Sequence, residues 1–228
     1  MIKSRFVLSG VLLAVVSAAP VFAQDDKKEA AGGTVELKLE LPKPMFVGTP
    51  RNLSSDNLEA PTSGPREAVK VPAGTTLISK GKTVTASDTE PVVGTLDLAT
   101  DGNKEGTDGN YVELGPGKQW VQIDLGKKSE ISAIVLWHFH SQARVYKDVV
   151  IQIADDADFI EKVRTVFNND HDNSAGLGIG KDKEWIETNS GRVIPVKEEK
   201  AQYIRLYSNG NTSNPMNQYL EVEVYGKQ

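Results

Sequence analysis

The segment from Thr100 to Gly126 constrains the fold of this chain more than any other stretch. Its first half is a polar loop crowded with Asp, Asn and Gly, and its second half alternates apolar and polar residues from Val121 to Leu125. Such alternation predicts a strand with one face in a core and the other in solvent. The loop supplies oxygen atoms and no soft ligands, a composition that suits a hard cation such as calcium.

Further strand patterns lie on both sides of this segment. Many short strands, long polar loops and the lack of an amphipathic helix pattern predict an all-β antiparallel sandwich. Ile131–Trp137 is apolar at consecutive positions, which predicts a central strand covered on both faces. Asp156 is a candidate cap for a helical turn within 154–166. The other strand candidates are Thr83–Ala86, Val149–Ile153, Trp185–Thr188, Val193–Val196, Tyr203–Tyr207 and Leu220–Tyr225.

Five short motifs occur in order along this part of the chain. They are T-A-S at 85–87, D-G-N-x-x-x-T at 101–107, W-V-Q-I-D-L-G at 120–126, A-x-Y-I-R-L-Y at 201–207 and E-V-E-V-Y-G at 221–226. As an ordered set they resemble discoidin domains, also called coagulation factor 5/8 type C domains. These domains are galactose-binding-like and close to the family 32 carbohydrate-binding modules. The resemblance covers Thr76 to Gly226 and implies an antiparallel eight-stranded jelly-roll β-sandwich with ligand loops at one end.

The N-terminal segment has the pattern of a secretory signal peptide. Lys3 and Arg5 precede an apolar run over 6–19, and residues 21–23 (V-F-A) form a plausible cleavage site. A membrane anchor is the alternative, but the run is shorter than the roughly 20 residues that span a bilayer. We therefore expect cleavage after Ala23 and a secreted or periplasmic protein.

Residues 24–74 form either a linker or an extended N-terminal arm laid over the domain that follows. Alternation within Thr34–Leu41 predicts one strand, which Pro42 and Pro44 end. The rest of the segment is rich in Pro, Ser, Asn and Gly, and either role fits this composition. The discoidin-like domain is expected over 75–228.

Composition excludes several classes of function. The chain has no cysteine, so it can form neither a disulfide nor a thiolate metal site. Removal of Lys3 and Arg5 with the leader changes the formal net charge from −5 to −5 − 2 = −7. We expect no nucleic-acid partner for an acidic protein without a basic patch, and no segment after the leader is apolar enough for a membrane span.

The Asp101 loop is not an EF-hand, although part of its spacing is similar. The closing Glu would fall at Val112, and no helix pattern flanks the loop. In the family that the chain resembles, this loop holds one structural calcium ion. The resemblance implies the ligands Asp101, Asn103 (through its backbone), Thr107 and Glu221, although the family often has a second Asp in place of Asn103. The alternative is an Asx-rich turn held by its own hydrogen bonds.

Two loops carry candidate ligand-binding residues. In the carbohydrate-binding relatives, the loop after the central strand often contributes a His, an Arg and an aromatic ring to sugar binding. The resemblance implies His140, Arg144 and Tyr146 here, although the relatives' fuller Arg-to-Asn spacing is absent. The second loop, Asn168–Asp182, can contact sugar hydroxyls, bind an ion or simply lie in solvent. Its candidates are Asp170, Asp172 and Asn173.

Catalytic and transition-metal interpretations have less support. On an extended loop Asp170 and Asp172 would lie on the same side, about 6–7 Å apart. Glycosidase carboxylates instead flank the bound sugar from opposite sides. His138 and His140 would share one face, and with His171 they could form a three-imidazole metal site. Nothing in the sequence places His171 beside them.

The sequence therefore predicts a non-catalytic secreted module that binds a glycan or cell-surface polysaccharide through its end loops. One structural calcium ion would support these loops. A protein- or surface-interaction (adhesion) module without a sugar site is the alternative, with candidate contacts at Leu177, Ile179 and Met216. A hydrolase that uses the Asp or His residues above is the third hypothesis. Trp120 and Trp137 lie within strands and are expected in the core.

Overall fold

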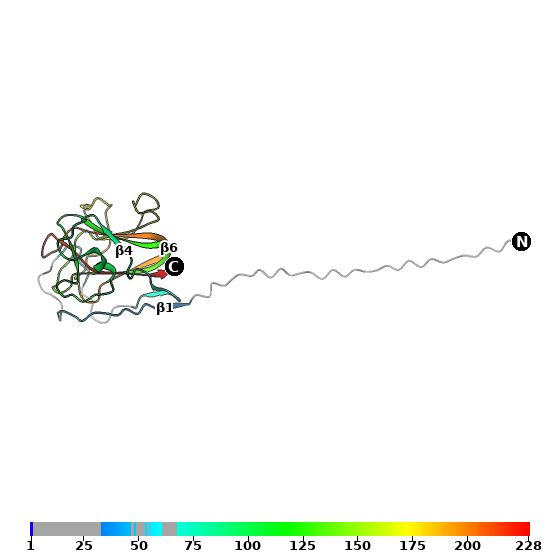
Figure 1. Cartoon of the computed structure of the whole chain (residues 1–228), viewed down its shortest axis with the longest axis horizontal. Helices are drawn as coiled ribbons and strands as arrows, with labels where there is room; N and C mark the ends of the chain where they lie inside the picture. The colour runs from blue at the N-terminus through cyan, green and yellow to red at the C-terminus, as the bar shows by residue number, and fades with distance from the viewer. Residues whose placement is uncertain (2–32, 47, 49–52, 54, 61–67) are drawn as a thin grey trace. The chain divides into compact units, whose positions relative to one another are not determined.

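The structure, a computed structural model, describes Met1 and residues 33–46, 48, 53, 55–60 and 68–228 (Figure 1). The predicted signal peptide lies outside the described residues, and the fold lies within the unit Gly32–Gln228. No described helix is long and apolar enough to cross a membrane. The elements are β1 (Thr34–Glu36), β2 (Lys70–Pro72), β3 (Thr76–Leu77), β4 (Thr83–Ala86), the 3-10 helix η1 (Leu96–Thr100), β5 (Val112–Leu114), β6 (Gln119–His138), β7 (Val150–Ala154), β8 (Arg164–Asn168), β9 (Arg192–Ser208) and β10 (Asn217–Lys227).

Strands β3 to β10 form one antiparallel network that folds into a two-layered sandwich. The order is β3–β10–β6–β9–β7–β8, with β4 added to β6 and β5 to β10. Strands β6 and β9 are long, at 20 and 17 residues, so that each can contribute to both layers of the sandwich. The first half of β6 pairs with β4, the second half pairs with β10, and both halves pair with β9. The all-β antiparallel sandwich of the jelly-roll type is therefore confirmed.

Four predicted strands are joined into two in the structure. Trp120–Leu125 and Ile131–Trp137 both belong to β6, and Val193–Val196 and Tyr203–Tyr207 both belong to β9. The polar residues that separate them in the sequence are paired across the two strands, with Ser129 opposite Ala201. Register shifts beside these pairs bend the strands without ending them.

Two other local predictions are wrong. No strand occupies 185–188, because this segment makes side-chain and loop contacts and only Glu184 forms an isolated bridge. The predicted helical turn after Asp156 is an irregular turn, in which the Asp156 carboxylate accepts from the N–H groups of Ile160 and Glu161. This turn leads into β8, a strand that the sequence analysis did not identify.

The main core lies between the layers and follows the alternation of the strands. Val121, Ile123 and Leu125 are fully buried, as predicted from their pattern. The Ile131–Trp137 stretch is covered on both faces, also as predicted. Its Ile134 and Leu136 side chains face the main core, whereas Val135 and Trp137 face a second cluster on the outside of β6 and β10.

The described N-terminal residues cover this outer cluster. β1 pairs with β2, and the Leu37 N–H donates to the Val69 carbonyl at 2.8 Å. The Leu37 and Leu39 side chains pack against the cluster, which contains Val135, Trp137, Phe139 and Leu220. The Asn189 amide also donates to the Pro42 carbonyl at 2.8 Å. Within the predicted strand over 34–41, only Thr34–Glu36 is regular strand.

Candidate functional site

Four loops meet at one end of the sandwich. The 139–148 loop contacts the 209–217 loop, where the Thr212 N–H donates to the Val145 carbonyl at 3.0 Å. The 101–118 region joins them because the Asn217 amide donates to the Gly115 carbonyl at 2.8 Å. The Asn168–Asp182 loop is attached by a 2.7 Å hydrogen bond from the Ser174 hydroxyl to Asp148. The strands thus bring loops from distant parts of the sequence together at one end of the sandwich.

Arg144 is the most constrained cation of this end. Its side chain is only 5% exposed, and its guanidinium lies 4.7 Å from the centre of the Phe139 ring. It donates to Gln218 at 3.3 Å and to Gln142 at 3.4 Å, and its Nε has no hydrogen-bond partner among the described residues. The half-buried Tyr111 ring meets Phe139 edge-on at 4.8 Å. A guanidinium and two rings therefore form one cluster, of which the half-buried Tyr111 ring reaches the surface.

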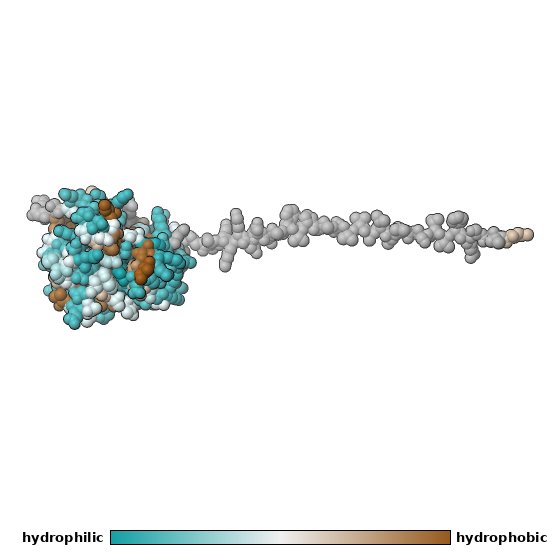
Figure 2. Space-filling model, turned by 90° about the horizontal axis from the view of Figure 1, so that it is seen from above, coloured by the Kyte–Doolittle hydropathy of each residue, from teal (hydrophilic) through white to brown (hydrophobic). Residues whose placement is uncertain are grey.

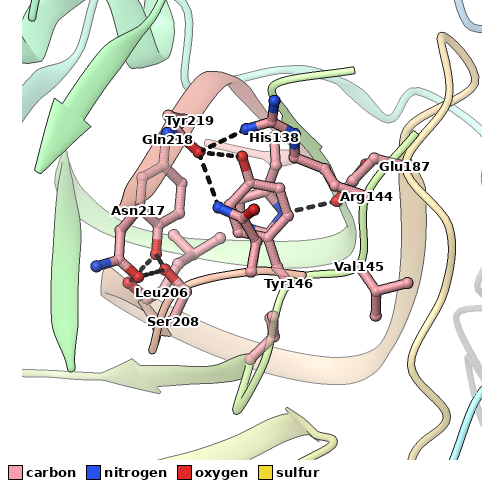
Figure 3. Close-up of polar contacts among 12 residues, drawn as sticks. His138, Arg144, Val145, Tyr146, Glu187, Leu206, Ser208, Asn217, Gln218 and Tyr219 are labelled. Carbon is pink, nitrogen blue, oxygen red and sulfur yellow. Dashed lines mark hydrogen bonds and ion pairs between the residues drawn. The ribbon is translucent and has the colours of Figure 1, made fainter. Parts of the chain in front are cut away.

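Tyr146 lies beneath this surface, in contact with the core. It is 2% exposed, and its hydroxyl donates to Gln218 Oε1 at 2.5 Å. The same oxygen accepts from Arg144 and from Asn211, so three donors converge on one amide (Figure 3). The predicted role of Tyr146 as an exposed sugar-stacking ring does not fit its position, because the main core covers it.

A buried histidine–glutamate pair, His138 and Glu187, lies on the interior side of the 139–148 loop. His138 Nδ1 lies 2.6 Å from Glu187 Oε1, with the two side chains 0% and 1% exposed. The His138 ring stacks on Tyr146, with centroids 4.0 Å apart, and also contacts Tyr219 and Trp185. His138 is therefore held in the interior and does not join His140 and His171 in a metal site.

His140 links the sugar-binding candidates to the Asp101 loop. It is fully buried, and its Nε2 lies 2.9 Å from the Lys104 carbonyl. Gly106 packs against its ring, since a side chain at Gly106 would lie 2.9 Å from His140 Cε1. His140 thus holds two loops together, and its ring does not face solvent.

The Asp101 loop has the hydrogen bonds of an Asx-rich turn and also a buried carboxylate that could bind a cation. Asp101 Oδ1 accepts from the Asn103 N–H at 2.7 Å, and Thr107 accepts from Asn110 at 2.6 Å, as in a self-supported Asx-rich turn. Glu221 adds a feature that such a turn does not need. Its Oε2 accepts from the Gly102 N–H at 3.0 Å, while its Oε1 is buried without a partner among the described residues.

The environment of Glu221 opposes a negative charge. Burial above all, together with the neighbouring Glu223 and Asp101 carboxylates, raises the pKa of Glu221 from 4.5 to about 8, against the lowering effects of the Gly102 hydrogen bond and of Lys104. A buried carboxylate of this kind fits a cation, because a bound positive charge would offset both burial and repulsion. The residues that could hold one are Asp101, Thr107, Glu221 and the backbone of Asn103.

The Asn168–Asp182 loop is organised by its own carboxylates. Asp170 is fully buried, and its two oxygens accept from the N–H groups of Ser174 and Ala175. Asp172 and Asn173 are exposed, and the Asn173 side chain accepts from the Gly178 N–H at 2.7 Å. Asp170 therefore shapes the loop, and only Asp172 and Asn173 of the three candidates face solvent.

One acidic group stands out among the residues that the structure describes. Asp148, Asp170 and Asp172 can bring one oxygen each within 4.8 Å of one another. Asp148 already accepts from Ser174 and Asn209, and Asp170 is satisfied by backbone N–H groups. These hydrogen bonds explain the contacts of the group without an ion.

The sequence analysis did not identify several residues that lie at the loop end of the sandwich. Phe139, Gln218 and Glu187 belong to segments interpreted as strand or loop without chemistry, and Tyr111 lies next to the Asp101 loop. The only local signal was the H-F-H triplet, in which the ring lies between two histidines that were noted. Gln218 and Glu187 carry no pattern that could connect them to Arg144, because they are distant in the sequence.

Comparison with solved structures shows the same architecture in carbohydrate-binding modules. The family 32 module from Clostridium perfringens NanJ, in complex with galactose, is 17% identical with a TM-score of 0.50 and coverage of 66% of this chain and 98% of that chain. A family 89 glycoside hydrolase from C. perfringens is 24% identical with a TM-score of 0.50, covering 67% of this chain and 15% of the enzyme. Chitosan-binding module 1 from a Paenibacillus sp. IK-5 chitosanase/glucanase is 21% identical with a TM-score of 0.44, covering 66% and 99%.

At these identities the solved structures establish the fold alone. No curated protein matches the chain. The family model for the F5/8 type C domain matches residues 83–222, which span most of the described sandwich and include the Asp101 loop, Arg144 and Glu221. This chain belongs to the F5/8 type C, or discoidin, domain family.

Proposed function

We propose that this chain is a non-catalytic carbohydrate-binding module whose ligand site surrounds Arg144. The position of the Arg144 guanidinium carries the proposal. It is fixed against the Phe139 ring and two amide oxygens, with the Tyr111 ring beside it. A sugar offers an apolar ring face and a rim of hydroxyls, and aromatic rings with oriented N–H donors complement both. Membership of the discoidin family supports the same function.

Tyr111 would add a neutral hydroxyl to this site. Burial, followed by the charges of Glu113 and Asp108, raises the pKa of Tyr111 above its usual 10.0. The phenol is therefore protonated at neutral pH and can both donate and accept hydrogen bonds with sugar hydroxyls. The partner expected from this chemistry is a glycan or a cell-surface polysaccharide.

The positions of the loop carboxylates support binding without catalysis. Asp170 is buried and engaged by two backbone N–H groups, so it is not free to transfer a proton to a substrate. Asp172 lies on the same loop and not across a sugar-sized gap from Asp170. A hydrolase that uses this pair is therefore less well supported than a binding module.

The proposed structural cofactor is one calcium ion in the Asp101 loop. The Glu221 oxygen without a partner supports it, and carboxylate, hydroxyl and carbonyl oxygens suit calcium. The ion would supply a fixed positive charge that orders this loop. Because His140 joins Lys104 of this loop to the segment that bears Arg144, ordering of the loop would extend to the sugar site. The N-terminal signal pattern supports a secreted or periplasmic location.

A glycan-array screen of the chain 24–228 tests the carbohydrate function. Wild-type protein and Arg144→Ala should be compared with the control Arg164→Ala, which removes an Arg of β8 that is ion-paired with Glu199. We expect binding to a narrow set of glycans that Arg144→Ala abolishes and Arg164→Ala retains. Equal binding by all three proteins would exclude the Arg144 site, and no binding by the wild type would reject the function.

A protein- or surface-interaction module remains the second candidate because of Ile179. This side chain is 71% exposed at a shallow cleft of about 340 Å³ between β8 and the 177–182 loop. On the face shown in Figure 2, hydrophobic patches are separated by hydrophilic residues. A pull-down that depends on Ile179, with no glycan bound by the wild type, would favour this candidate.

A further inference from the structure

We infer that Glu187 is a positioning residue for the carbohydrate site: its backbone and its carboxylate each hold Arg144 in its binding geometry. The inference rests on the proposed function. Glu187 is fully buried and is not placed to touch a ligand. Its effect on binding must therefore pass through the residues that it contacts.

The backbone contact is direct. The Glu187 N–H donates to the Arg144 carbonyl at 2.9 Å. This hydrogen bond attaches the 139–148 loop to the segment after Trp185, although 43 positions separate the two residues (187 − 144). The main chain of Arg144 is thereby fixed from the interior side, where water cannot compete for the same groups.

The side-chain contact runs through three residues and returns to Arg144. Glu187 Oε1 lies 2.6 Å from His138 Nδ1, and the His138 ring stacks on Tyr146 with centroids 4.0 Å apart. The Tyr146 hydroxyl and the Arg144 guanidinium donate to the same oxygen of Gln218 (Figure 3). Backbone and side-chain contacts together form a closed circuit that begins and ends at Arg144.

The His138–Glu187 contact has no substitute within the described residues. His138 Nε2 and Glu187 Oε2 are both buried without a hydrogen-bond partner there. Each side chain therefore depends on the other for its only hydrogen bond to a described residue. Loss of this contact would free the His138 ring to tilt, and Tyr146 would lose the surface on which it stacks.

Charged and titratable side chains also surround the His138–Glu187 pair. The charged and titratable groups packed around the pair are Arg144, Tyr146, Tyr219 and Arg192, which lies 5.2 Å from the Trp185 ring centre. Burial raises the pKa of Tyr146 and of Tyr219, so both phenols stay neutral. Arg144 and Glu187 act on the same Tyr146 phenol in opposite directions, Arg144 lowering its pKa and Glu187 raising it, so the three side chains belong to one buried group.

The test compares Glu187→Gln with Glu184→Gln. Glu184 is a buried glutamate of the same segment that bonds to Ser55, outside the circuit. Affinity for the glycan selected by the wild-type screen is measured by calorimetry, and the Arg144 Nε–H resonance of the free protein by NMR. We expect Glu187→Gln, whose amide oxygen can still accept from His138 but carries no charge, to bind about fivefold more weakly and to shift the resonance. Glu184→Gln should change neither.

Several results separate the inference from its alternatives. Wild-type affinity and an unmoved Arg144 resonance in Glu187→Gln would overturn it. If Glu187→Gln does not fold, Tyr146→Phe removes only the hydroxyl that shares Gln218 with Arg144, and it should weaken binding in the same way. Wild-type binding by Tyr146→Phe would then overturn the inference. Failure of the proposed function is distinct, because the wild type and Arg144→Ala would then bind glycans equally or not at all.

Discussion

The carboxylate of Glu221 accepts a hydrogen bond from the backbone N–H of Gly102 at 3.0 Å, which joins β10 to a loop 119 residues earlier. Only one of its oxygens is used in this way. The other is buried without a partner among the described residues, beside the Asp101 loop. Two predictions depend on this single carboxylate, one on cation binding and one on pH.

Calcium should stabilise the wild-type protein and leave Glu221→Gln unchanged. A ligand that binds only the folded state adds about 2.7 kcal/mol when it is present at 100 times its Kd. Differential scanning fluorimetry in calcium and in EDTA measures the effect as a shift in Tm. The control is Asp108→Asn, which neutralises an exposed carboxylate of the same loop and should respond like the wild type. An equal shift in Glu221→Gln would place the ion elsewhere.

In EDTA, the protein should lose stability as the pH rises from 4.5 toward 8. Glu221 keeps its proton in the folded state up to about pH 8, whereas the unfolded chain releases it near 4.5. Within this window the folded state binds more protons, so the free energy of unfolding falls by up to about 1.4 kcal/mol per pH unit. Urea unfolding at pH 5 and pH 8 measures the loss. Glu221→Gln should show a smaller dependence, and calcium should reduce it in the wild type.

Removing Leu39 should loosen the N-terminal arm, whereas removing Leu41 should not. Leu39 packs against the Trp137 cluster, but Leu41 is 51% exposed two residues later. Leu39→Ala should cost about 1–3 kcal/mol, less than a fully buried Leu, and Leu41→Ala under about 0.5 kcal/mol. Limited trypsin digestion should cut Leu39→Ala faster at Lys38. Equal rates in the two variants would mean that Leu39 does not hold the arm.

Arg205→Lys should destabilise the sandwich although it keeps the charge. The guanidinium of Arg205 lies between two rings, 4.3 Å from Trp120 and 4.1 Å from Phe159, and donates twice to Gln122. A lysine can neither stack between the rings nor form the double contact, so we expect a loss of about 1–2 kcal/mol. Urea unfolding measures it. In a Gln122→Ala background the loss should shrink, and an unchanged loss would show that the two residues are not coupled.

The sequence by itself determined the class of fold and the family. Alternation from Val121 to Leu125 placed the correct side chains in the core because strand periodicity is a property of the local backbone. The ordered motifs identified the discoidin family, which the match to 83–222 confirms. The motif order also fixes which loop follows the central strand, and the prediction that Arg144 in this loop contacts a ligand stays a prediction.

Only the tertiary structure decided which groups surround these residues. Strand alternation alone puts Leu220 on the same face as Val222, but a register shift between Tyr219 and Glu221 moves Leu220 to the outer cluster, and Glu221 is fully buried. Glu187 and Gln218 meet Arg144 only because folding brings strand β10 and the segment after Trp185 against the 139–148 loop. Local patterns report the conformation of neighbouring residues, whereas burial, charge and hydrogen-bond partners are set by segments that folding brings together from far along the chain.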